Sequence, residues 1–178
     1  ELGYHFKTQI LNGMNYGNVP QNRERIFIVG FLDEDKLNKF KFPEPIELTK
    51  SIRDMLEEDV SDEYYYNDKP LFDRIKDDVN DENVVYQWRR KYVRANKSGV
   101  CPTLTANMGT GGHNVPIIKD KKGIRKLTPK ECFNIQGFPK DFKLPNLAKS
   151  KLYHQAGNSV VVPVIQRIAI EMKKVLDE

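Results

Sequence analysis

An almost unbroken apolar run at residues 26–31 places the strongest limit on how this chain can fold. It follows directly on a charged segment that contains Arg23 and Arg25. A strand that is apolar on both faces is typical of a sheet that is covered on both sides. We therefore predict a strand over residues 25–31 that is buried on both faces, with the two arginines where a loop enters it. The pattern at residues 6–11 predicts a second strand.

The clearest local signal is a helix that begins at residues 128–131. Thr128 can cap the free N–H groups of the first turn, and Pro129 fits the first helical position. Glu131 can reach back to the cap in a capping box. Gly137 then ends this short helix.

A second helix is predicted near the C-terminus. It begins within residues 160–163, and Pro163 must fall in its first turn because deeper in the helix it would break the backbone ladder. One apolar stripe follows at helical spacing, formed by Ile165, Ile168, Ala169, Met172 and Leu176.

Turn, strand and helix signals predict the remaining elements. They are a loop at 12–20, a boundary between lobes at 33–48, a short helix at 51–56 capped by Ser51, strands at 84–93, 102–107 and 115–118, and a glycine-rich loop at 108–112.

Composition is that of a soluble folded protein, with 39% apolar residues among 178 and a mean hydropathy of −0.63. No apolar run approaches the roughly 20 residues that a membrane helix needs, and no signal peptide is recognisable. The chain begins at Glu1 rather than at Met. We therefore expect its natural N-terminus to lie upstream.

The two cysteines, Cys101 and Cys132, and the three histidines lack the spacing of a zinc site, so no metal is predicted. The cysteines either form one disulfide or stay reduced and buried. The reduced form is the ordinary one for a cytosolic protein, and we expect it here.

Charge is unevenly distributed, although the formal net charge is only +4. Residues 54–82 hold twelve acidic and three basic side chains, whereas residues 85–126 hold ten basic and one acidic. A dense basic block is typical of a protein that binds a polyanion. The alternative is that the basic block simply pairs with the acidic one.

Arg23 and Arg25 are the first candidate site residues. Two positions apart in an extended strand, they would share one face and could both address one phosphate or base edge. Alternatively, they are surface arginines that pair with Glu24 or Asp33.

A second candidate surface interleaves aromatic side chains with cations. Arginine binds guanine edges and phosphates, threonine hydroxyls suit phosphate contacts, and glycine loops let the backbone approach a polyanion closely. The alternative is a solvated strand followed by a glycine turn. The candidate DNA-binding residues are Arg89, Arg90, Arg94, Lys97, Thr103, Leu104, Thr105, Gly111 and Gly112.

Three motifs, in this order, resemble the last third of the DNA (cytosine-5) methyltransferases. They are Gln21-x-Arg23-x-Arg25, the segment from Arg125 to Glu131 that continues to Gln136-Gly137-Phe138-Pro139, and Gln155-Ala156-Gly157-Asn158-Ser159-Val160. They resemble the eighth, ninth and tenth motifs of that family, with the variable target-recognition domain between the first two. The resemblance covers nearly the whole chain and is weakest at residues 54–82.

The resemblance implies an α/β fold: the C-terminal piece of a doubly wound, S-adenosylmethionine-dependent methyltransferase domain, plus a small, mainly β target-recognition domain. It implies that residues 1–42 end the catalytic domain, that residues 43–150 form the recognition domain, and that residues 151–178 return to the catalytic domain. The partners implied are duplex DNA and an N-terminal catalytic half. The bacterial cytoplasm is the implied location, and a restriction-modification system the implied context.

Enzymes of this family turn the target cytosine out of the duplex. A cysteine thiolate adds to C6, a glutamate assists at N3, and C5 takes the methyl group and then loses its proton. The resemblance implies that Arg25 contacts the flipped cytosine or its phosphate and that Arg23 supports it. Thr103 and Leu104 would position the recognition loops, and Arg125 and Glu131 would organise the small domain. The residues that would contact the amino-acid end of S-adenosylmethionine are Asn158, Ser159 and Val160.

The Pro-Cys nucleophile and the glycine-rich cofactor loop of the family have no counterparts here. Glu82-Asn83-Val84 spells the family's acid triplet but follows the arginine motif instead of preceding it, so we interpret it as chance. Cys101-Pro102 reverses the nucleophile order, and neither Cys101 nor Cys132 is interpreted as the nucleophile. We therefore predict no methyl transfer by these 178 residues alone.

We also predict exposed apolar surface around Ile28 and on the last helix, where the other half would pack and where dimers could form artificially. Three readings remain open. The chain is part of a methyltransferase, either a fragment or one subunit of a naturally split enzyme; or it is a DNA-binding module without catalysis; or it is a structural domain whose charged blocks neutralise each other.

Overall fold

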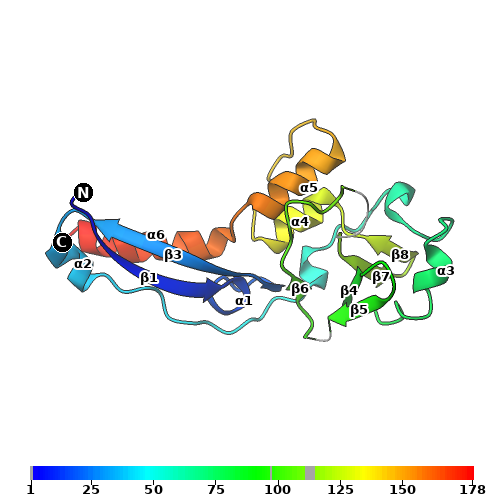
Figure 1. Cartoon of the computed structure of the whole chain (residues 1–178), viewed down its shortest axis with the longest axis horizontal. Helices are drawn as coiled ribbons and strands as arrows, with labels where there is room; N and C mark the ends of the chain where they lie inside the picture. Colours follow the sequence, from blue (N-terminus) through cyan, green and yellow to red (C-terminus); the bar gives the residue numbers. More distant parts are fainter. Residues whose placement is uncertain (1, 97, 111–114) are drawn as a thin grey trace.

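The chain folds into two lobes that lie end to end in the computed structural model (Figure 1). The structure describes residues 2–96, 98–110 and 115–178. In chain order the elements are β1 (His5–Asn12), α1 (Gly13–Tyr16), β2 (Gln21–Asn22), β3 (Glu24–Phe31), α2 (Glu34–Lys39), the 3-10 helices η1 (Arg53–Met55) and η2 (Asp62–Tyr64), α3 (Phe72–Ile75), β4 (Val85–Trp88), β5 (Val93–Asn96), β6 (Cys101–Pro102), β7 (Ile117–Asp120), β8 (Gly123–Lys126), α4 (Pro129–Ile135), α5 (Lys149–Asn158) and α6 (Val162–Leu176). The chain leaves the first lobe after α2 and returns to it between α5 and α6.

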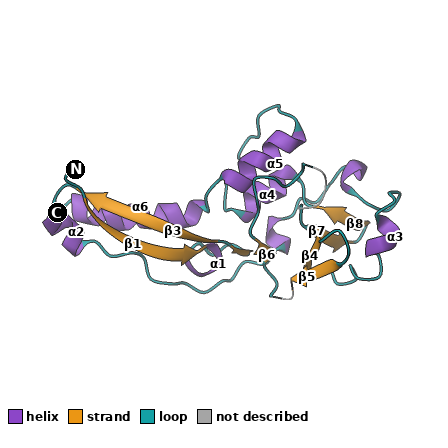
Figure 2. Cartoon of the chain, viewed as in Figure 1, coloured by secondary structure: helices purple, strands orange, loops and turns teal. Residues whose placement is uncertain are grey.

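The first lobe is a two-stranded antiparallel hairpin packed on a helix. β1 and β3 pair along their whole lengths, from His5 opposite Phe31 to Asn12 opposite Glu24. One face of this hairpin packs against α6 and forms a common core with it (Figure 2). The side chains that meet in this core include Leu11, Val29 and Phe31 from the strands and Val164, Ile168 and Val175 from α6.

The opposite face of the hairpin is apolar and exposed. Phe6, Ile10, Ile26 and Ile28 are each between 61% and 66% exposed. The prediction that residues 25–31 are buried on both faces is therefore wrong for this chain, because within the described residues only one face is covered. The prediction of exposed apolar surface around Ile28 is confirmed.

The last helix begins as predicted and presents a different face from the predicted one. Pro163 lies in its first turn, and no N–H is lost from the helix interior. The buried side chains are Val164, Ile168 and Val175, whereas Ile165 is 40% and Leu176 53% exposed. The contact with the β1–β3 hairpin selects this face, which the apolar spacing alone placed incorrectly.

Two further local predictions need correction. The predicted loop at residues 12–20 contains α1, whose first turn is capped by the Asn12 side chain accepting from the Met14 N–H. The predicted helix at residues 51–56 shortens to η1. Ser51 does not cap η1, because its N–H and Oγ instead donate to the Asp54 carboxylate at 2.7 and 2.9 Å.

The second lobe is built on a four-stranded antiparallel sheet in the order β5-β4-β7-β8. The predicted strand at 84–93 is in fact a hairpin of β4 and β5, closed where the Arg89 N–H donates to the Tyr92 carbonyl at 2.9 Å. Arg90 in the turn has a φ of +66°, which is unusual for a residue with a Cβ. The predicted strand at 102–107 shortens to β6, which pairs in parallel with β2 at the junction of the lobes.

Two helices connect the four-stranded sheet to the junction. α4 carries the full predicted capping box, with Thr128 and Glu131 bonded reciprocally, and Gly137 follows it with a φ of +79°. α5 was not predicted. Its Tyr153 and Ala156 are buried in the same core as Cys132 and Ile135 of α4.

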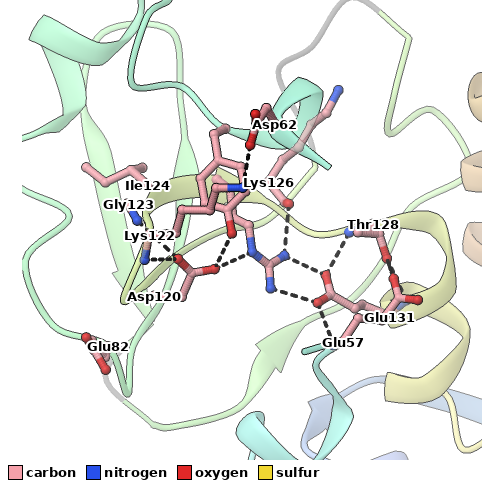
Figure 3. A network of polar contacts seen from close by, with 12 residues as sticks. Glu57, Asp62, Glu82, Asp120, Lys122, Gly123, Ile124, Lys126, Thr128 and Glu131 are labelled. Carbon is pink, nitrogen blue, oxygen red and sulfur yellow. Dashed lines mark hydrogen bonds and ion pairs between the residues drawn. The ribbon is translucent and has the colours of Figure 1, made fainter. Parts of the chain in front are cut away.

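A buried ion pair joins the sheet to α4 (Figure 3). Arg125 donates to both oxygens of Glu131 at 2.8 Å and to Asp120 at 2.6 Å, and Arg125 and Glu131 are 1% and 0% exposed. Glu131 also accepts from the Thr128 N–H. Burial alone would lower the pKa of Arg125, but its bonds to Glu131 and Asp120 raise it above the ordinary value. The guanidinium is thus always charged, and the pair fixes the position of α4 on the sheet.

Candidate functional site

The site lies at the junction of the two lobes. A cavity of about 230 Å³ is lined by Arg23 and Arg25 from one side and by Asn158, Ser159 and Val160 from the other. Two of the motifs that the sequence singled out, more than 130 residues apart along the chain, thus border one space.

Arg23 is buried at the centre of the junction. Its Nη1 donates to the Leu104 carbonyl at 2.8 Å, and its Nη2 donates to the carbonyls of Gly157 and Ser159 at 3.0 and 2.9 Å. Burial, assisted by the charge of Arg25, lowers the pKa of Arg23 to about 10. The guanidinium therefore remains charged at neutral pH while three backbone carbonyls hold it in place.

Arg25 differs from Arg23 in being exposed. Among the described residues its side chain makes one hydrogen bond, from Nη1 to the neighbouring Glu24 carbonyl at 2.6 Å, and it has no ion pair there. Arg23 precedes β3 and is buried, whereas Arg25 lies in β3 and is exposed. They nevertheless border the same cavity, and Arg25 keeps free donors for a ligand.

The turn between α5 and α6 supplies the other wall. Asn158 ends α5 with its side-chain amide 3.3 Å from the ring nitrogens of His154. Ser159 donates its hydroxyl to the Ala156 carbonyl at 2.9 Å, which closes the last turn of the helix. Val160 is 48% exposed and lies between the two helices.

The Thr103-Leu104-Thr105 segment approaches the cavity from the second lobe. Thr103 donates its hydroxyl to the Asn22 carbonyl at 2.7 Å, and Thr105 donates to the Asn107 side chain at 2.7 Å. Leu104 is only 1% exposed and packs in the core. Leu104 was predicted as a DNA-binding residue, and this needs correction, because its side chain anchors the segment and only neighbouring groups can face a ligand.

The predicted basic surface is concentrated at the tip of the β4–β5 hairpin. Arg89, Arg90 and Arg94 are exposed, and Lys91, which the sequence analysis did not single out, is exposed between them. None of the four has an ion pair within residues 2–96, 98–110 and 115–178, and Tyr92 beside them is 59% exposed. At this hairpin the described residues show no pairing with the acidic block at 54–82, although Lys122 of the basic block does pair with Asp62 of the acidic one. Lys97, Gly111 and Gly112 lie outside the described residues.

Sequence reasoning missed one contact of the site. Gly157 lies so close to the backbone of Thr105 and Ala106 that a Cβ at this position would collide with it. The signal available was the small pair Ala156-Gly157 inside a helix, which is typical of a close approach by another segment.

Both cysteines are free and buried, as expected. Burial raises the pKa of each thiol well above its ordinary value, so neither can supply a thiolate near neutral pH. Glu82 lies outside the cavity and pairs with Arg53 at 2.9 Å. Over the described parts of the chain, His, Cys, Asp and Glu side chains form no group of three that could hold a metal ion. No helix in these parts is long and apolar enough to cross a membrane.

Comparison with known proteins gives a consistent result. Residues 1–174 match the model of a family described as C-5 cytosine-specific DNA methylase. Type II methyltransferase M.Bsp6I of Bacillus sp. (strain RFL6) is 57% identical over 176 residues, which cover 97% of this chain and 56% of that protein. Type II methyltransferase M.NlaX of Neisseria lactamica is 35% identical over 187 residues, 99% of this chain and 55% of that protein.

The fold also matches a solved structure. The S. pombe Dnmt2 methyltransferase superimposes with a TM-score of 0.68 at 17% identity, over 99% of this chain and 59% of that one. The chain thus spans about half the length of the proteins it matches.

Proposed function

Because this chain belongs to the C-5 cytosine-specific DNA methylase family, we propose that it is the target-recognition and C-terminal part of a DNA (cytosine-5-)-methyltransferase. Its mixed α/β fold is the C-terminal part of the S-adenosylmethionine-dependent methyltransferase fold. The observation that carries the proposal is the single cavity bordered by Arg23, Arg25, Asn158 and Ser159. We place the parent protein in the bacterial cytoplasm, as the DNA-modifying member of a restriction-modification system.

The proposed catalytic and recognition domains correspond to the two lobes. Residues 1–42 and 151–178 belong to the catalytic domain and residues 43–150 to the recognition domain. α5 crosses this boundary, since its Tyr153 packs in the recognition core and its last residue borders the cavity.

Within the cavity, the proposed role of Arg25 is to hold the flipped cytosine or its phosphate. The exposed guanidinium has donors to spare, and an arginine without an acidic partner suits a polar or anionic ligand. Bound S-adenosylmethionine supplies the methyl group. The amide of Asn158 and the polar backbone of Ser159 and Val160 fit the charged amino-acid end of that cofactor, and they border the cavity where the target base would enter.

The nucleophilic cysteine and the acidic glutamate are proposed to come from an N-terminal half. The exposed outer face of the β1–β3 hairpin supports this partner. Phe6, Ile10, Ile26 and Ile28 form an exposed apolar face, and an exposed apolar patch of this kind is typical of a surface that another element covers. Left uncovered, the same face promotes artificial self-association.

The first test is reconstitution. The 178 residues alone are expected to transfer no labelled methyl group from S-adenosylmethionine to duplex DNA. Mixed with an N-terminal half that carries the Pro-Cys and Glu-Asn-Val motifs, they are expected to do so. If no mixture methylated any duplex, although both parts were folded, the proposal would be contradicted.

DNA contact by the β4–β5 hairpin gives a second prediction. Replacing Arg89, Arg90 and Arg94 with alanine should reduce the slope of log K against log salt for duplex binding by about 2 to 3, since each phosphate contact contributes about 0.9. The measurement is fluorescence anisotropy of a labelled duplex between low and moderate salt.

A matched control removes the same charge from the opposite end of the molecule. Lys39, Lys173 and Lys174 are exposed on α2 and α6, and their replacement with alanine should leave the slope unchanged. Equal slopes for both triple variants would show that net charge, rather than the hairpin, drives binding.

A further inference from the structure

Arg23 joins two segments that have separate proposed roles. Its guanidinium donates to the Leu104 carbonyl, which lies in residues 103–106 (the recognition segment). It also donates to the Gly157 and Ser159 carbonyls, in the turn beside the proposed cofactor site. The three donor–acceptor distances lie between 2.8 and 3.0 Å. No carboxylate pairs with Arg23 within the described residues, and the three hydrogen bonds of its side chain all go to backbone carbonyls.

Two more contacts hold the same segments together. The Thr103 hydroxyl donates to the Asn22 carbonyl at 2.7 Å, one residue before Arg23. Gly157 packs against the backbone of Thr105 and Ala106 without room for a side chain. These contacts link the arginine motif, the recognition segment and the α5–α6 turn to one another.

We propose that Arg23 is a positioning residue that couples target recognition to cofactor binding by locking the Leu104 segment onto the Gly157–Ser159 turn. This inference rests on the proposed function. Arg23 touches neither substrate nor cofactor in this role, and it acts through the backbone that carries Asn158, Ser159 and Thr105.

The geometry requires arginine. A planar guanidinium presents several donors in a fixed arrangement and can satisfy three carbonyls at once, whereas a lysine ammonium is a single point on a flexible stem. Loss of the donors leaves buried carbonyls without partners. The segments are then expected to separate slightly, and displacements of about 1 Å cost on the order of 10²-fold in catalysis.

Arg167 offers a matched control. It donates to the Tyr16 carbonyl at 2.9 Å and to the Glu44 carbonyl at 2.8 Å, so it also clamps backbone far away in sequence. Both of its acceptors precede η1, and neither belongs to the recognition segment or to the α5–α6 turn. Replacing it removes a structural clamp of similar kind without separating the recognition segment from the α5–α6 turn.

The experiment compares Arg23→Ala, Arg23→Lys and Arg167→Ala in the protein that carries this chain together with its N-terminal half. Without cofactor, one measures the ratio of Kd values for a target duplex and a duplex with one altered base pair. With cofactor, one measures kcat and the KM for S-adenosylmethionine. Hydrogen exchange at residues 104–108 reports whether the segment has loosened.

Both Arg23 variants are expected to reduce the Kd ratio by about tenfold, as one lost base discrimination of ~1.4 kcal/mol would. They should also raise the KM for S-adenosylmethionine and speed exchange at 104–108, with kcat/KM lowered about 10²-fold. Arg167→Ala should lower the unfolding midpoint while leaving these quantities unchanged. Arg23→Lys keeps the charge and the side-chain stem, so it answers the question even where Arg23→Ala is poorly folded.

Two outcomes would overturn the coupling. One is an Arg23→Lys protein with an unaltered Kd ratio, KM and exchange rate. The other is an Arg167→Ala protein that changes all three as Arg23→Lys does. Absence of methyl transfer by the unmutated protein would instead overturn the proposed function, and this inference with it.

Discussion

Replacing Glu131 with alanine is expected to lower the free energy of unfolding by about 3–5 kcal/mol, the usual cost of stranding one partner of a buried ion pair. Glu131 is fully buried and receives both Nη atoms of Arg125 at 2.8 Å. It also accepts the N–H groups of Thr128 and Glu57. The substitution therefore leaves two backbone donors unsatisfied, and it leaves the buried Arg125 with Asp120 as its one remaining ionic partner among the described residues.

Urea unfolding followed by the fluorescence of Trp88 measures this loss. Trp88 is the single tryptophan of the chain, and at 6% exposure it is buried in the second lobe. The matched control is Glu82→Ala, which removes the carboxylate of the exposed Arg53–Glu82 pair and should cost about 0–1 kcal/mol. Equal, small losses for both variants would show that the buried pair does not hold the lobe together.

Replacing Arg25 with alanine is expected to lower kcat for methyl transfer by about 10²–10³-fold, the effect of removing one well-placed donor from a reacting group. Arg25 is exposed and bonds only to the adjacent Glu24 carbonyl within the described residues. The variant should therefore fold normally, with stability unchanged within about 0.5 kcal/mol. The measurement is single-turnover methylation at saturating DNA and cofactor, in the protein with its N-terminal half.

Arg25→Lys separates charge from geometry, since it keeps the cation and loses the planar fork. An intermediate rate is expected for it. If Arg25→Ala weakened DNA binding and left the single-turnover rate unchanged, Arg25 would be a backbone anchor and not a contact to the reacting base.

The sequence predicted best those features that depend on neighbouring residues. The capping box of Thr128 and Glu131 and the position of Pro163 were confirmed because helix starts are set by local hydrogen bonds and local sterics. The family resemblance singled out Arg23, Arg25 and Asn158, which the structure brings to one cavity; spacing along the sequence contains no such long-range information.

Features that depend on distant packing were predicted less well. The turn at Arg90 contains no glycine, proline or asparagine, so the sequence gives no turn signal to indicate that residues 84–93 form a hairpin. α5 was missed because its apolar residues are few and are buried by α4 and by Thr105. The strand at 26–31 is apolar on both faces although only one face is covered within the described residues, which is why burial was overestimated.

The route of the chain between its lobes has a consequence for variation. The polypeptide leaves the hairpin-and-helix lobe once, after α2, and rejoins it once, between α5 and α6. Between these two crossings the chain builds the second lobe, and it enters and leaves that lobe at the junction. Substitutions, insertions or deletions far from these two crossings can therefore change the surface of the second lobe without disturbing how β1, β3 and α6 pack.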